Sequence, residues 1–382
     1  MSSSQSIPRS SPVSHVRSTV TIGPEIITNL SGDEWDRAIS GFADACYEQT
    51  ERLQGAKWGD NRVRRMAISI NGKIVAMALA IVLKLPILNR GLALVKFGPL
   101  WRRKGELPDR QVLGLALDAL VDQLMVHERL SLSIMPPPDP RFAAIWVEEL
   151  HQRHFEHRPF QDAERFLVNT ALSPERQLAS LDQRWRYNLK SALRNELLVG
   201  LEEPSAALAD FGMLCESMRN RKNYSNPLWP LFEKALSSHH TPAISPALVL
   251  VREKGNAIAG AIIVQIGDTA YYAVGASNDR GIKLNAGYAL QWWIVAWLRD
   301  RQCHWYDLGE AVPGSGLRQF KKGLVGKGGA IEHLPGEFIF SPDVLSAVAA
   351  RLLLGVRRMR LVLRVWIRES KGLLSPQQRQ RR

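Results

Sequence analysis

The stretch "PALVLVREKGNAIAGAIIVQIG" at residues 246–267 contains two β-type runs separated by Lys254-Gly255-Asn256. A short turn between two runs rich in Val, Ile and Ala predicts a β-hairpin. Outward from it, "TAYYAVGAS" (269–277) predicts a strand, "NAGYALQWWIVAWLRDRQ" (285–302) an amphipathic helix, and "HWYDLGE" (304–310) a short strand. The predicted unit is therefore a hairpin, a strand, a helix and a closing strand.

The same order of elements occurs earlier in the chain. "MAISINGKIVAMALAIVLKL" (66–85) predicts a hairpin around Asn71-Gly72, and "GLALVKFGPLWRR" (91–103) predicts the next strand. A helical stretch from Asp109 and the strand "LSLSIM" (130–135) complete this first copy. We therefore predict an internal duplication.

The duplication suggests a domain layout. We expect a disordered N-terminus over residues 1–20, a first domain over 21–165, a second domain with the donor site over 166–340, and a basic amphipathic helix and tail over 341–382. Ser and Pro dominate the opening residues, and the later apolar runs are shorter than a membrane span. We therefore expect a cytoplasmic protein, with a peripheral position at the inner face of the membrane as an alternative.

The positive charge is local. The chain has 382 residues and a formal charge of +13, but residues 351–382 contain nine Arg and one Lys against one Glu, which gives +9 and leaves +4 for the rest. A generally basic nucleic-acid-binding surface is therefore not predicted. The three cysteines have no CxxC spacing, which argues against a disulfide framework or a zinc site.

The junction between the third strand and the helix of each unit is a candidate anion site. The first amides of a helix have no intrahelical partner, and the helix dipole favours negative charge there. In the second copy we expect Asn285 to cap the helix and Gly287 to let a ligand approach, with Arg280 and Lys283 just upstream. The first copy has Arg102, Arg103 and Lys104 at this place, but proline residues flank its turn. The second site is the better candidate.

Four further motifs resemble those of the Fem-type aminoacyltransferases that build peptidoglycan cross-bridges, and of their relatives among the two-domain GNAT acyltransferases. They are "WRYNLKSALRN" (185–195), "YYAVGASNDRGIKLNAGYALQWW" (271–293), "YDLGE" (306–310) and "GLRQFKKGLVG" (316–326). The resemblance implies an α/β (α+β) fold of two tandem GNAT-like domains, each a mixed, mainly antiparallel sheet flanked by helices.

The resemblance also implies acyl transfer to an amine. Fem-type enzymes take the acyl group from aminoacyl-tRNA and give it to the peptide of a peptidoglycan precursor, while other relatives use acyl-CoA. We therefore expect no tightly bound cofactor, an acyl donor as co-substrate, and an amine acceptor that is lipid-linked in one version of the hypothesis. The sequence does not decide between the two donors.

The glycine-rich, basic stretch at 306–329 is the predicted catalytic loop. Phe320 and Lys321 match the family's Phe-Lys pair, in which the lysine is thought to stabilise charge at the donor end of the site. An ammonium group can meet an anionic tetrahedral centre; alternatively, Lys321 is a solvated loop charge. Asp307 is placed to help deprotonate the amine, to orient the loop, or to cap the following turn. The run from Gly323 to Gly328 departs from the family's Gly-Phe-Gly-Gly-like pattern.

The acceptor side is predicted from two places. "SMRNRKNYSNPLWP" (217–230) contains Arg221 and Tyr224, which resemble the Arg…Tyr element with which Fem-type enzymes contact their precursor. The alternative is a basic last turn that complements the helix dipole. Tyr272 falls where the family places a tyrosine toward the substrate, although Tyr271 and Tyr272 must face opposite sides of the sheet.

Two helical patterns carry positive charge. In "LDQRWRYNLKSALRNEL" (181–197), Leu181, Trp185 and Leu189 form an apolar face, and Arg186, Lys190 and Arg194 form a basic ridge. The ridge suits a tRNA backbone or is a solvated face. Residues 342–371 combine apolar residues with arginines, which predicts either contact with an anionic membrane or packing on the first domain.

Two other classes of function remain open. One is an acyl-CoA-dependent N-acyltransferase acting on a small molecule or a sugar, although "DRGIKLNAG" only loosely approximates the usual pyrophosphate loop of GNAT enzymes. The other is a non-catalytic module that binds an anion or a membrane. The sequence shows no arrangement of a nucleophilic Ser or Cys, which favours direct transfer without a covalent intermediate.

Overall fold

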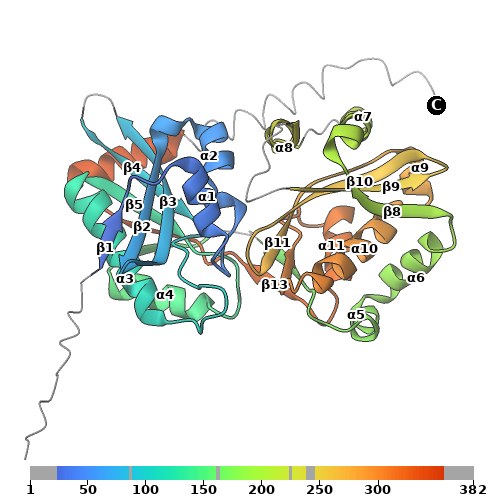
Figure 1. Cartoon of the computed structure of the whole chain (residues 1–382), viewed down its shortest axis with the longest axis horizontal. Coiled ribbons are helices and arrows are strands. Elements are labelled where there is room, and N and C mark those ends of the chain that lie inside the picture. The colour runs from blue at the N-terminus through green and yellow to red at the C-terminus, as the bar shows by residue number, and fades with distance from the viewer. Residues whose placement is uncertain (1–23, 86–87, 161–163, 223–225, 238–245, 357–382) are drawn as a thin grey trace, which may run out of the picture.

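The fold consists of two seven-stranded sheets, each covered by helices. The computed structural model describes residues 24–85, 88–160, 164–222, 226–237 and 246–356. Figure 1 shows the two sheets beside one another along the long axis of the molecule. The predicted disordered residues 1–20 and the basic tail from residue 357 onward lie outside the described residues.

The strands divide between the sheets as follows. The first sheet has the order β1 (Glu25–Ile27), β2 (Val63–Ile70), β3 (Lys73–Leu85), β4 (Arg90–Lys96), β5 (Leu130–Met135), β14 (Glu337–Phe340), β6 (Glu156–Arg158). The second has the order β13 (Ala330–His333), β7 (Glu164–Asn169), β12 (Trp305–Asp307), β11 (Thr269–Ser277), β10 (Asn256–Gln265), β9 (Ala247–Glu253), β8 (Leu197–Glu202). Among the described strands, the β4–β5 and β11–β12 pairs are parallel and the other pairs are antiparallel. The predicted class, two mixed and mainly antiparallel sheets flanked by helices, is confirmed.

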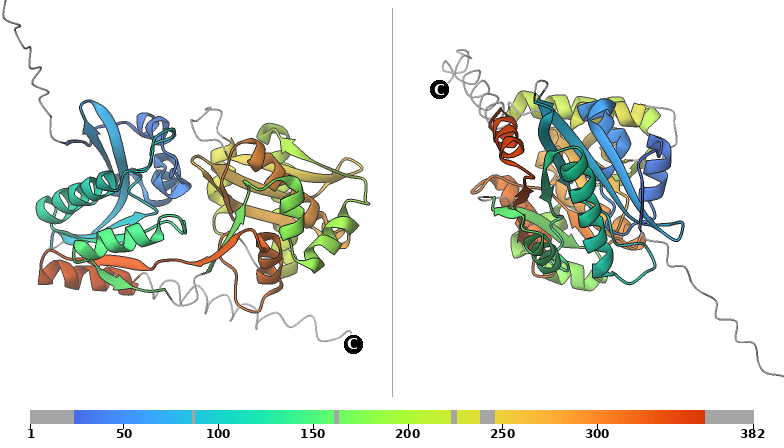
Figure 2. Two further views of the ribbon diagram at one scale, coloured as in Figure 1. Left: turned by 90° about the horizontal axis from the view of Figure 1, so that it is seen from below. Right: turned by 90° about the vertical axis from the view of Figure 1, so that its left-hand side faces the viewer.

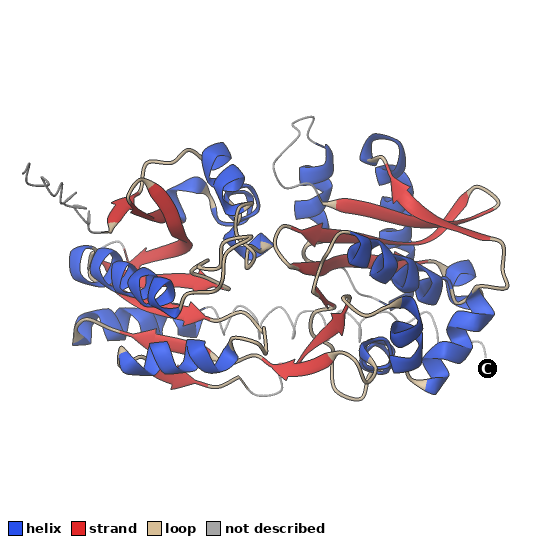
Figure 3. Ribbon diagram, turned by 60° about the horizontal axis from the view of Figure 1, so that its bottom comes forward, coloured by secondary structure: helices blue, strands red, loops and turns tan. Residues whose placement is uncertain are grey.

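Helices pack on the strands of both sheets (Figure 3), and each sheet with its helices is called a half of the protein below. The first half contains α1 (Gly32–Ile39), η1 (Tyr47–Gln49), α2 (Glu51–Trp58), η2 (Asp60–Arg62), α3 (Arg110–Leu120), the π-helix η3 (Val121–His127) and α4 (Ala143–Gln152). The second contains α5 (Pro174–Ser180), α6 (Gln183–Ala192), α7 (Pro204–Lys222), α8 (Trp229–Ser237), α9 (Asp279–Lys283), α10 (Ala286–Asp300) and α11 (Gly316–Val325). A last helix covers residues 344–356. None of these helices is both long and apolar enough to span a bilayer.

The two halves repeat one topology. The hairpin β2–β3, strand β4, helix α3 and strand β5 correspond in order to β9–β10, β11, α10 and β12. Both hairpins turn on two residues with positive φ, Asn71-Gly72 at 52° and 75°, and Lys254-Gly255 at 48° and 84°. This backbone matches the twist of adjacent strands, which explains why the turn signals in the sequence were reliable.

The chain returns to the first sheet after it completes the second. Strand β13 pairs with β7 in the second sheet, but β14 pairs with β5 and β6 in the first. The predicted second domain, 166–340, therefore includes one strand that belongs to the first sheet. Short-range patterns do not reveal this exchange, because the partners of β14 lie about two hundred residues earlier.

A shared apolar core joins the halves. Residues of α1 and β3, such as Trp35, Ile39 and Met77, form one buried cluster with Phe211 of α7 and Phe232 of α8. The other face of the first sheet packs against α3 and α4, and α6, α10 and α11 pack against the second sheet. Because α7 and α8 contribute to the cluster that includes the first sheet, the two halves are held by burial of apolar surface.

A charged contact adds to this interface. The Arg102 guanidinium lies 3.0 Å from Asp268, which follows β10 in the second half, and 3.6 Å from Asp139. Lys104 Nζ donates to the carbonyl oxygen of Ile266 at 2.9 Å. Two of the three basic residues of the first predicted anion site are therefore bound to the second half of the protein. The third, Arg103, donates to the carbonyl oxygen of Ile74.

Candidate active site

Lys321 lies on a helix. The predicted catalytic loop is wrong in this respect, because residues 316–325 form α11. Ser315 caps the helix by accepting from the Arg318 amide at 3.1 Å, and the helix ends at Gly326, which has a φ of 59°. The many glycines suggested a flexible segment, but the apolar side of α11 buries Leu324 and packs on the second sheet. Tertiary packing overrides the low helix propensity of glycine here.

Glycine has a packing role at position 323. A Cβ atom there would lie 2.9 Å from the ring of Trp185 on α6. The absence of a side chain lets α11 approach Trp185 closely, and Phe320 contacts the same ring with a centroid distance of 5.9 Å. Phe320 also meets Tyr288 of α10 edge to face at 5.0 Å. The predicted substrate residue Phe320 thus lies in an aromatic cluster of α6, α10 and α11.

The ammonium group of Lys321 is buried and held by two carbonyl groups. Only 5% of this residue is exposed. Nζ donates to the carbonyl oxygen of Leu308 at 2.5 Å and to that of Glu310 at 2.8 Å. An ammonium group has three N–H donors, and within the described residues the third has no partner. Burial lowers the pKa of Lys321 to about 8, although the Asp307 carboxylate opposes this shift.

Asp307 completes a charged cluster with a residue that the sequence analysis missed. Its carboxylate accepts from Arg165 Nη2 at 2.5 Å and from Nε at 3.1 Å. Its other oxygen accepts from the Gly309 amide at 2.8 Å, which confirms that Asp307 caps the following turn. Arg165 also lies 3.7 Å from Glu310. A single arginine inside the apolar strand "ERFLVN" was the available signal, but its partner is distant in sequence.

The cluster lies where two parallel strands stop pairing. Strands β11 and β12 pair only over Thr269–Tyr271 and Trp305–Asp307, and β11 then continues to Ser277. The carbonyl groups just after β12 are consequently free of the sheet ladder and accept from Lys321. The Lys321 ammonium group therefore lies just beyond the carboxyl end of β12.

The first half of the protein reaches the cluster through Tyr47 and Phe97. The Tyr47 ring contacts Tyr271 edge to face at 5.2 Å, and Arg165 lies over the Phe97 ring at 5.9 Å. Tyr271 therefore faces the first half. Burial raises the pKa of Tyr47 well above its ordinary value, so Tyr47 is neutral at physiological pH.

A cavity of about 80 Å³ opens in the first half, between the sheet and α2, and Glu48 is among the residues that line it. Its polar lining includes Glu48, which forms a 2.5 Å ion pair with Lys96, and Ser133, which donates to Glu337 at 2.5 Å. Burial raises the pKa of the Glu48 carboxyl, but attraction to Lys96 and Lys57 and hydrogen bonds to the carboxylate together outweigh burial and leave that pKa below its ordinary value. The cavity therefore has both charge signs and apolar walls.

The predicted anion site at α10 is only partly as expected. Asn285 is the N-cap residue of α10, as predicted, but it has a left-handed φ of 55° and its side chain makes no capping hydrogen bond. Its side chain donates instead to Ser191 Oγ at 3.3 Å. The extra helix α9, capped by Asn278, changes the path of the chain before α10. A Cβ at Gly287 would meet nothing within 4 Å, so the backbone there is accessible.

The two cations near α10 differ. Arg280 is exposed and forms a two-point ion pair with Glu253 at 2.5 and 2.7 Å. Lys283 is exposed at the end of α9, and within the described residues no ion-pair partner lies close to it. Of the two predicted phosphate ligands, Lys283 is thus the more available.

The predicted acceptor residues do not gather around Lys321. Arg221 pairs with Asp279 at 2.9 Å and donates to the Ser277 carbonyl oxygen at 2.9 Å, at the far end of β11. Tyr224 lies outside the described residues. Tyr272 meets Tyr306 edge to face at 6.4 Å, and burial raises its pKa to about 12. The apolar face predicted for residues 181–197 is confirmed, because Leu181, Trp185 and Leu189 are buried.

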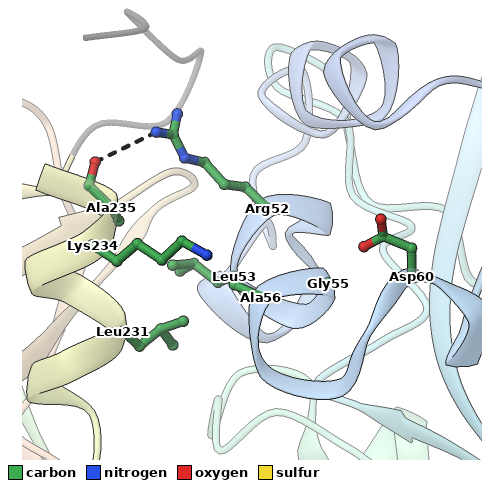
Figure 4. A pocket seen from close by; sticks show the side chains of 8 residues that line it. All are labelled: Arg52, Leu53, Gly55, Ala56, Asp60, Leu231, Lys234 and Ala235. Atoms are coloured by element: carbon green, nitrogen blue, oxygen red, sulfur yellow. Dashed lines mark hydrogen bonds between the residues drawn. The ribbon is translucent and has the colours of Figure 1, made fainter. Parts of the chain in front are cut away.

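A larger groove of about 460 Å³ lies elsewhere between the halves, lined by α2 and α8 (Figure 4). Arg52 donates to the carbonyl oxygen of Ala235 across it at 3.4 Å, and Lys234 extends from α8 toward α2. No residue of β12 or α11 lines this groove. The cluster around Lys321 is the better candidate active site, because it combines buried charges with an N–H donor that has no partner within the described residues.

Known proteins share this architecture. Residues 246–354, which include β11, α10, β12 and α11, match the FemAB family. The crystal structure of FemX superposes with a TM-score of 0.69 at 16% identity, over 83% of this chain and 97% of that chain. The chain has the Fem-type fold. The predicted resemblance is confirmed by the family match in the second half and by the fold over both halves.

Two further solved structures share the Fem-type fold. One is the C-terminal DUF2156 domain of an Agrobacterium fabrum protein assigned as a lysylphosphatidylglycerol synthetase, with a TM-score of 0.52, 16% identity, and coverage of 85% of this chain and 96% of that chain. The other is a conserved protein of unknown function from Bacteroides thetaiotaomicron, with a TM-score of 0.54, 12% identity, and coverage of 81% and 97%. No curated protein sequence matches the chain.

Proposed function

We propose that the protein is an acyltransferase that moves an acyl or aminoacyl group from an activated ester to an amine of a cell-envelope precursor or polysaccharide unit. The FemAB match and the Fem-type fold support the reaction class. The single observation that carries the proposal is the buried Lys321 ammonium at the end of β12, with two N–H groups held by carbonyl oxygens and a third available.

The chemistry needs a cation where negative charge develops. The acceptor nitrogen attacks the carbonyl carbon of the donor ester, and the carbonyl oxygen becomes an oxyanion. When the tetrahedral centre collapses, the bond from the carbonyl carbon to the donor's leaving atom breaks, and the proton lost by the nitrogen ends on the leaving group. The available N–H of Lys321 is suited to stabilise the oxyanion, because a fixed donor in a buried site needs little reorganisation.

Asp307 has a positioning role in this proposal. One of its oxygens accepts from Arg165 and the other from the Gly309 amide, so the carboxylate is engaged and buried. It fixes the turn whose carbonyl groups hold Lys321. A general-base role, which was one reading of the sequence, fits this geometry less well because the carboxylate has no exposed face.

We place the acceptor in the cavity between α2 and the first sheet, and the donor at the α10 side of β11. The cavity offers Glu48, Lys96, Ser133 and Glu337, a set of groups that can bind an amine together with nearby hydrogen-bonding groups. On the donor side, Gly287 and Lys283 are accessible to a phosphate, which both aminoacyl-tRNA and acyl-CoA carry. The donor acts as a co-substrate.

The test is acyl transfer by Lys321→Ala. We expect at least an approximately tenfold loss of turnover, or about 1.4 kcal/mol of transition-state stabilisation. Labelled aminoacyl-tRNA and acyl-CoA are offered separately with a panel of amine acceptors, and RNase treatment separates the two donor routes. Lys322→Ala is the matched control, because Lys322 lies on the same helix and is exposed.

Unchanged turnover in Lys321→Ala would refute the role of the ammonium group. Absence of transfer from either donor by the wild-type protein, across the acceptor panel, would favour the non-catalytic module. Loss of turnover in Lys322→Ala of the same size would mean that the effect comes from the charge of α11 in general.

A further inference from the structure

The last described helix, residues 344–356, exposes a stripe of large apolar side chains. Figure 2 shows this helix in red on the outer side of the first half of the protein. The exposed fractions are 78% for Val344, 58% for Leu345, 44% for Val348, 56% for Leu352 and 44% for Val356. At 3.6 residues per turn, these five positions fall in one sector of about 120°. An exposed contiguous apolar stripe on a folded domain marks an interaction surface.

The orientation of this helix is fixed by its opposite face. Ala349 and Ala350 are buried. Ser346 Oγ donates to the carbonyl oxygen of Arg129 at 2.8 Å, and Ser131 Oγ donates to the carbonyl oxygen of Ser346 at 2.9 Å. Asp343 caps the helix by accepting from the Ser346 amide at 2.7 Å. The most buried residues of the packed face, Ser346, Ala349 and Ala350, are small. Leu353 and Leu354 on the same side are partly exposed, and the five large residues of the stripe are directed outward.

The sequence after this helix is strongly basic. Residues 357–382 contain nine Lys or Arg and one Glu. At helical spacing, Met359, Val362, Leu363 and Trp366 fall in the same sector as the exposed stripe, and Arg357, Arg360, Arg364 and Arg368 fall on the other side. On that other side Leu361 and Val365 fall between arginines, so the sequence pattern continues the stripe and forms no second continuous apolar face. A basic amphipathic pattern of this kind is typical of segments that lie on membranes.

We infer that the outward face of residues 344–356 binds the surface of an anionic lipid bilayer, and that the cations after residue 356 strengthen this binding. The apolar side chains enter the boundary between headgroups and acyl chains, while the cations meet anionic headgroups. A second copy of this chain is a poorer partner for the stripe, because the two basic segments would repel each other. The inference does not depend on the proposed acyl transfer, but it would bring the transferase to a lipid-linked acceptor.

The test is sedimentation of the full chain with vesicles of phosphatidylcholine, with and without phosphatidylglycerol. We expect binding to the anionic vesicles that weakens with added salt. The triple variant Leu345→Ser, Val348→Ser, Leu352→Ser should lose affinity by about tenfold or more, because three apolar contacts with the bilayer are removed. The control changes three exposed apolar residues elsewhere, Leu107→Ser, Met213→Ser and Val312→Ser, and should bind as the wild type does.

Other outcomes overturn the inference. Equal binding of the triple variant and the wild type would mean that the arginines act without the stripe. A triple variant that unfolds at a clearly lower temperature in the absence of vesicles would mean that the chain's own tail covers the stripe, since fully exposed substitutions change stability little. Dimerisation that the triple variant abolishes would identify a second copy as the partner. Lys321→Ala should bind vesicles normally, so failure of the acyl-transfer proposal is distinguishable from failure of this one.

Discussion

The two halves of the protein use one topology at their parallel strand pairs, but they differ in how far the strands pair. In the first half β4 and β5 pair over six positions, from Gly91–Leu130 to Lys96–Met135. In the second half β11 and β12 pair over three positions and then separate. The early separation exposes the carbonyl groups after β12, and these hold Lys321. A duplicated unit can thus gain a candidate site through a shorter strand pairing.

The loops before the two corresponding helices also differ in what they bind. Arg102 and Lys104 of the first half are bound to residues of the second half. Phe97, at the end of β4, is buried and extends this contact toward Arg165. In the second half, Lys283 is exposed and the backbone at Gly287 is accessible. The first copy therefore serves the interface between the halves, while the second copy keeps groups available for a ligand.

The largest effect is expected from Arg165→Met. This change leaves the buried Asp307 carboxylate without its cation, which typically costs about 3–5 kcal/mol of the free energy of unfolding. We also expect turnover to fall, because the turn that holds Lys321 loses its anchor. Denaturant unfolding and transfer assays measure the two effects.

The double variant Arg165→Met, Asp307→Asn is the partner of this experiment. Removal of both charges should restore part of the stability, because no unpaired carboxylate remains. Arg280→Met, which breaks an exposed ion pair in the same half, should change the free energy of unfolding far less, because solvent screens that pair. Equal costs for Arg165→Met and Arg280→Met would contradict the buried cluster.

Much of the fold was predictable, because the strongest signals were local. The turns at Asn71-Gly72 and Lys254-Gly255 fixed both hairpins, and the apolar spacing of Trp185 and Leu189 identified the buried face of α6. The exchange of β14 into the first sheet depends on contacts distant in sequence and was missed. So was the helical state of residues 316–325, where packing against Trp185 overcomes the flexibility of glycine.

The candidate site was predictable only in part, for the same reason. Phe320, Lys321 and Asp307 were identified by their resemblance to family motifs. Phe320 and Lys321 lie in α11, and the Asp307 carboxylate lies close enough to Lys321 to influence its pKa. Arg165 was missed because ion-pair partners across a sheet leave no spacing signal in the sequence. Arg221 was selected by pattern but pairs with Asp279 at the other end of β11.

A smaller effect is expected in how turnover depends on pH. The pKa of Lys321 is lowered to about 8, so its ammonium form is lost as pH rises through 8. If the ammonium form is the active one, the ratio of wild-type turnover to that of Lys321→Met should be constant below pH 8. Above pH 8 the ratio should fall by about tenfold per pH unit. The acceptor amine also titrates, but it affects both proteins equally and cancels in the ratio.

The same pKa shift predicts that the free energy of unfolding rises with pH above pH 8. Between pH 8 and the ordinary pKa of lysine, the unfolded chain binds more protons at this position than the folded chain. The penalty that Lys321 imposes on the folded state is therefore present below pH 8 and is relieved as pH rises. Lys321→Met should be the more stable protein near pH 7, and this difference should shrink in alkaline buffer. If the ratio of wild-type turnover to Lys321→Met turnover did not change with pH, the ammonium group would be excluded from the reaction.

The smallest effect, Gly287→Ala, tests whether the second copy kept its helix N-terminus for a ligand. Because a Cβ at this position meets nothing within 4 Å and the residue is helical, alanine should raise the free energy of unfolding by about 0.5–1 kcal/mol. If the phosphate of the donor approaches the backbone there, the added methyl group should raise KM for the donor several-fold and leave kcat nearly unchanged. The control is Gly114→Ala in α3, the corresponding helix of the first half, where a Cβ would lie 3.0 Å from the flexible end of Arg153. That variant should change stability only slightly and should not change KM. A Gly287→Ala protein that is more stable but has the wild-type KM would remove α10 from the donor site and make the two helix N-termini equivalent.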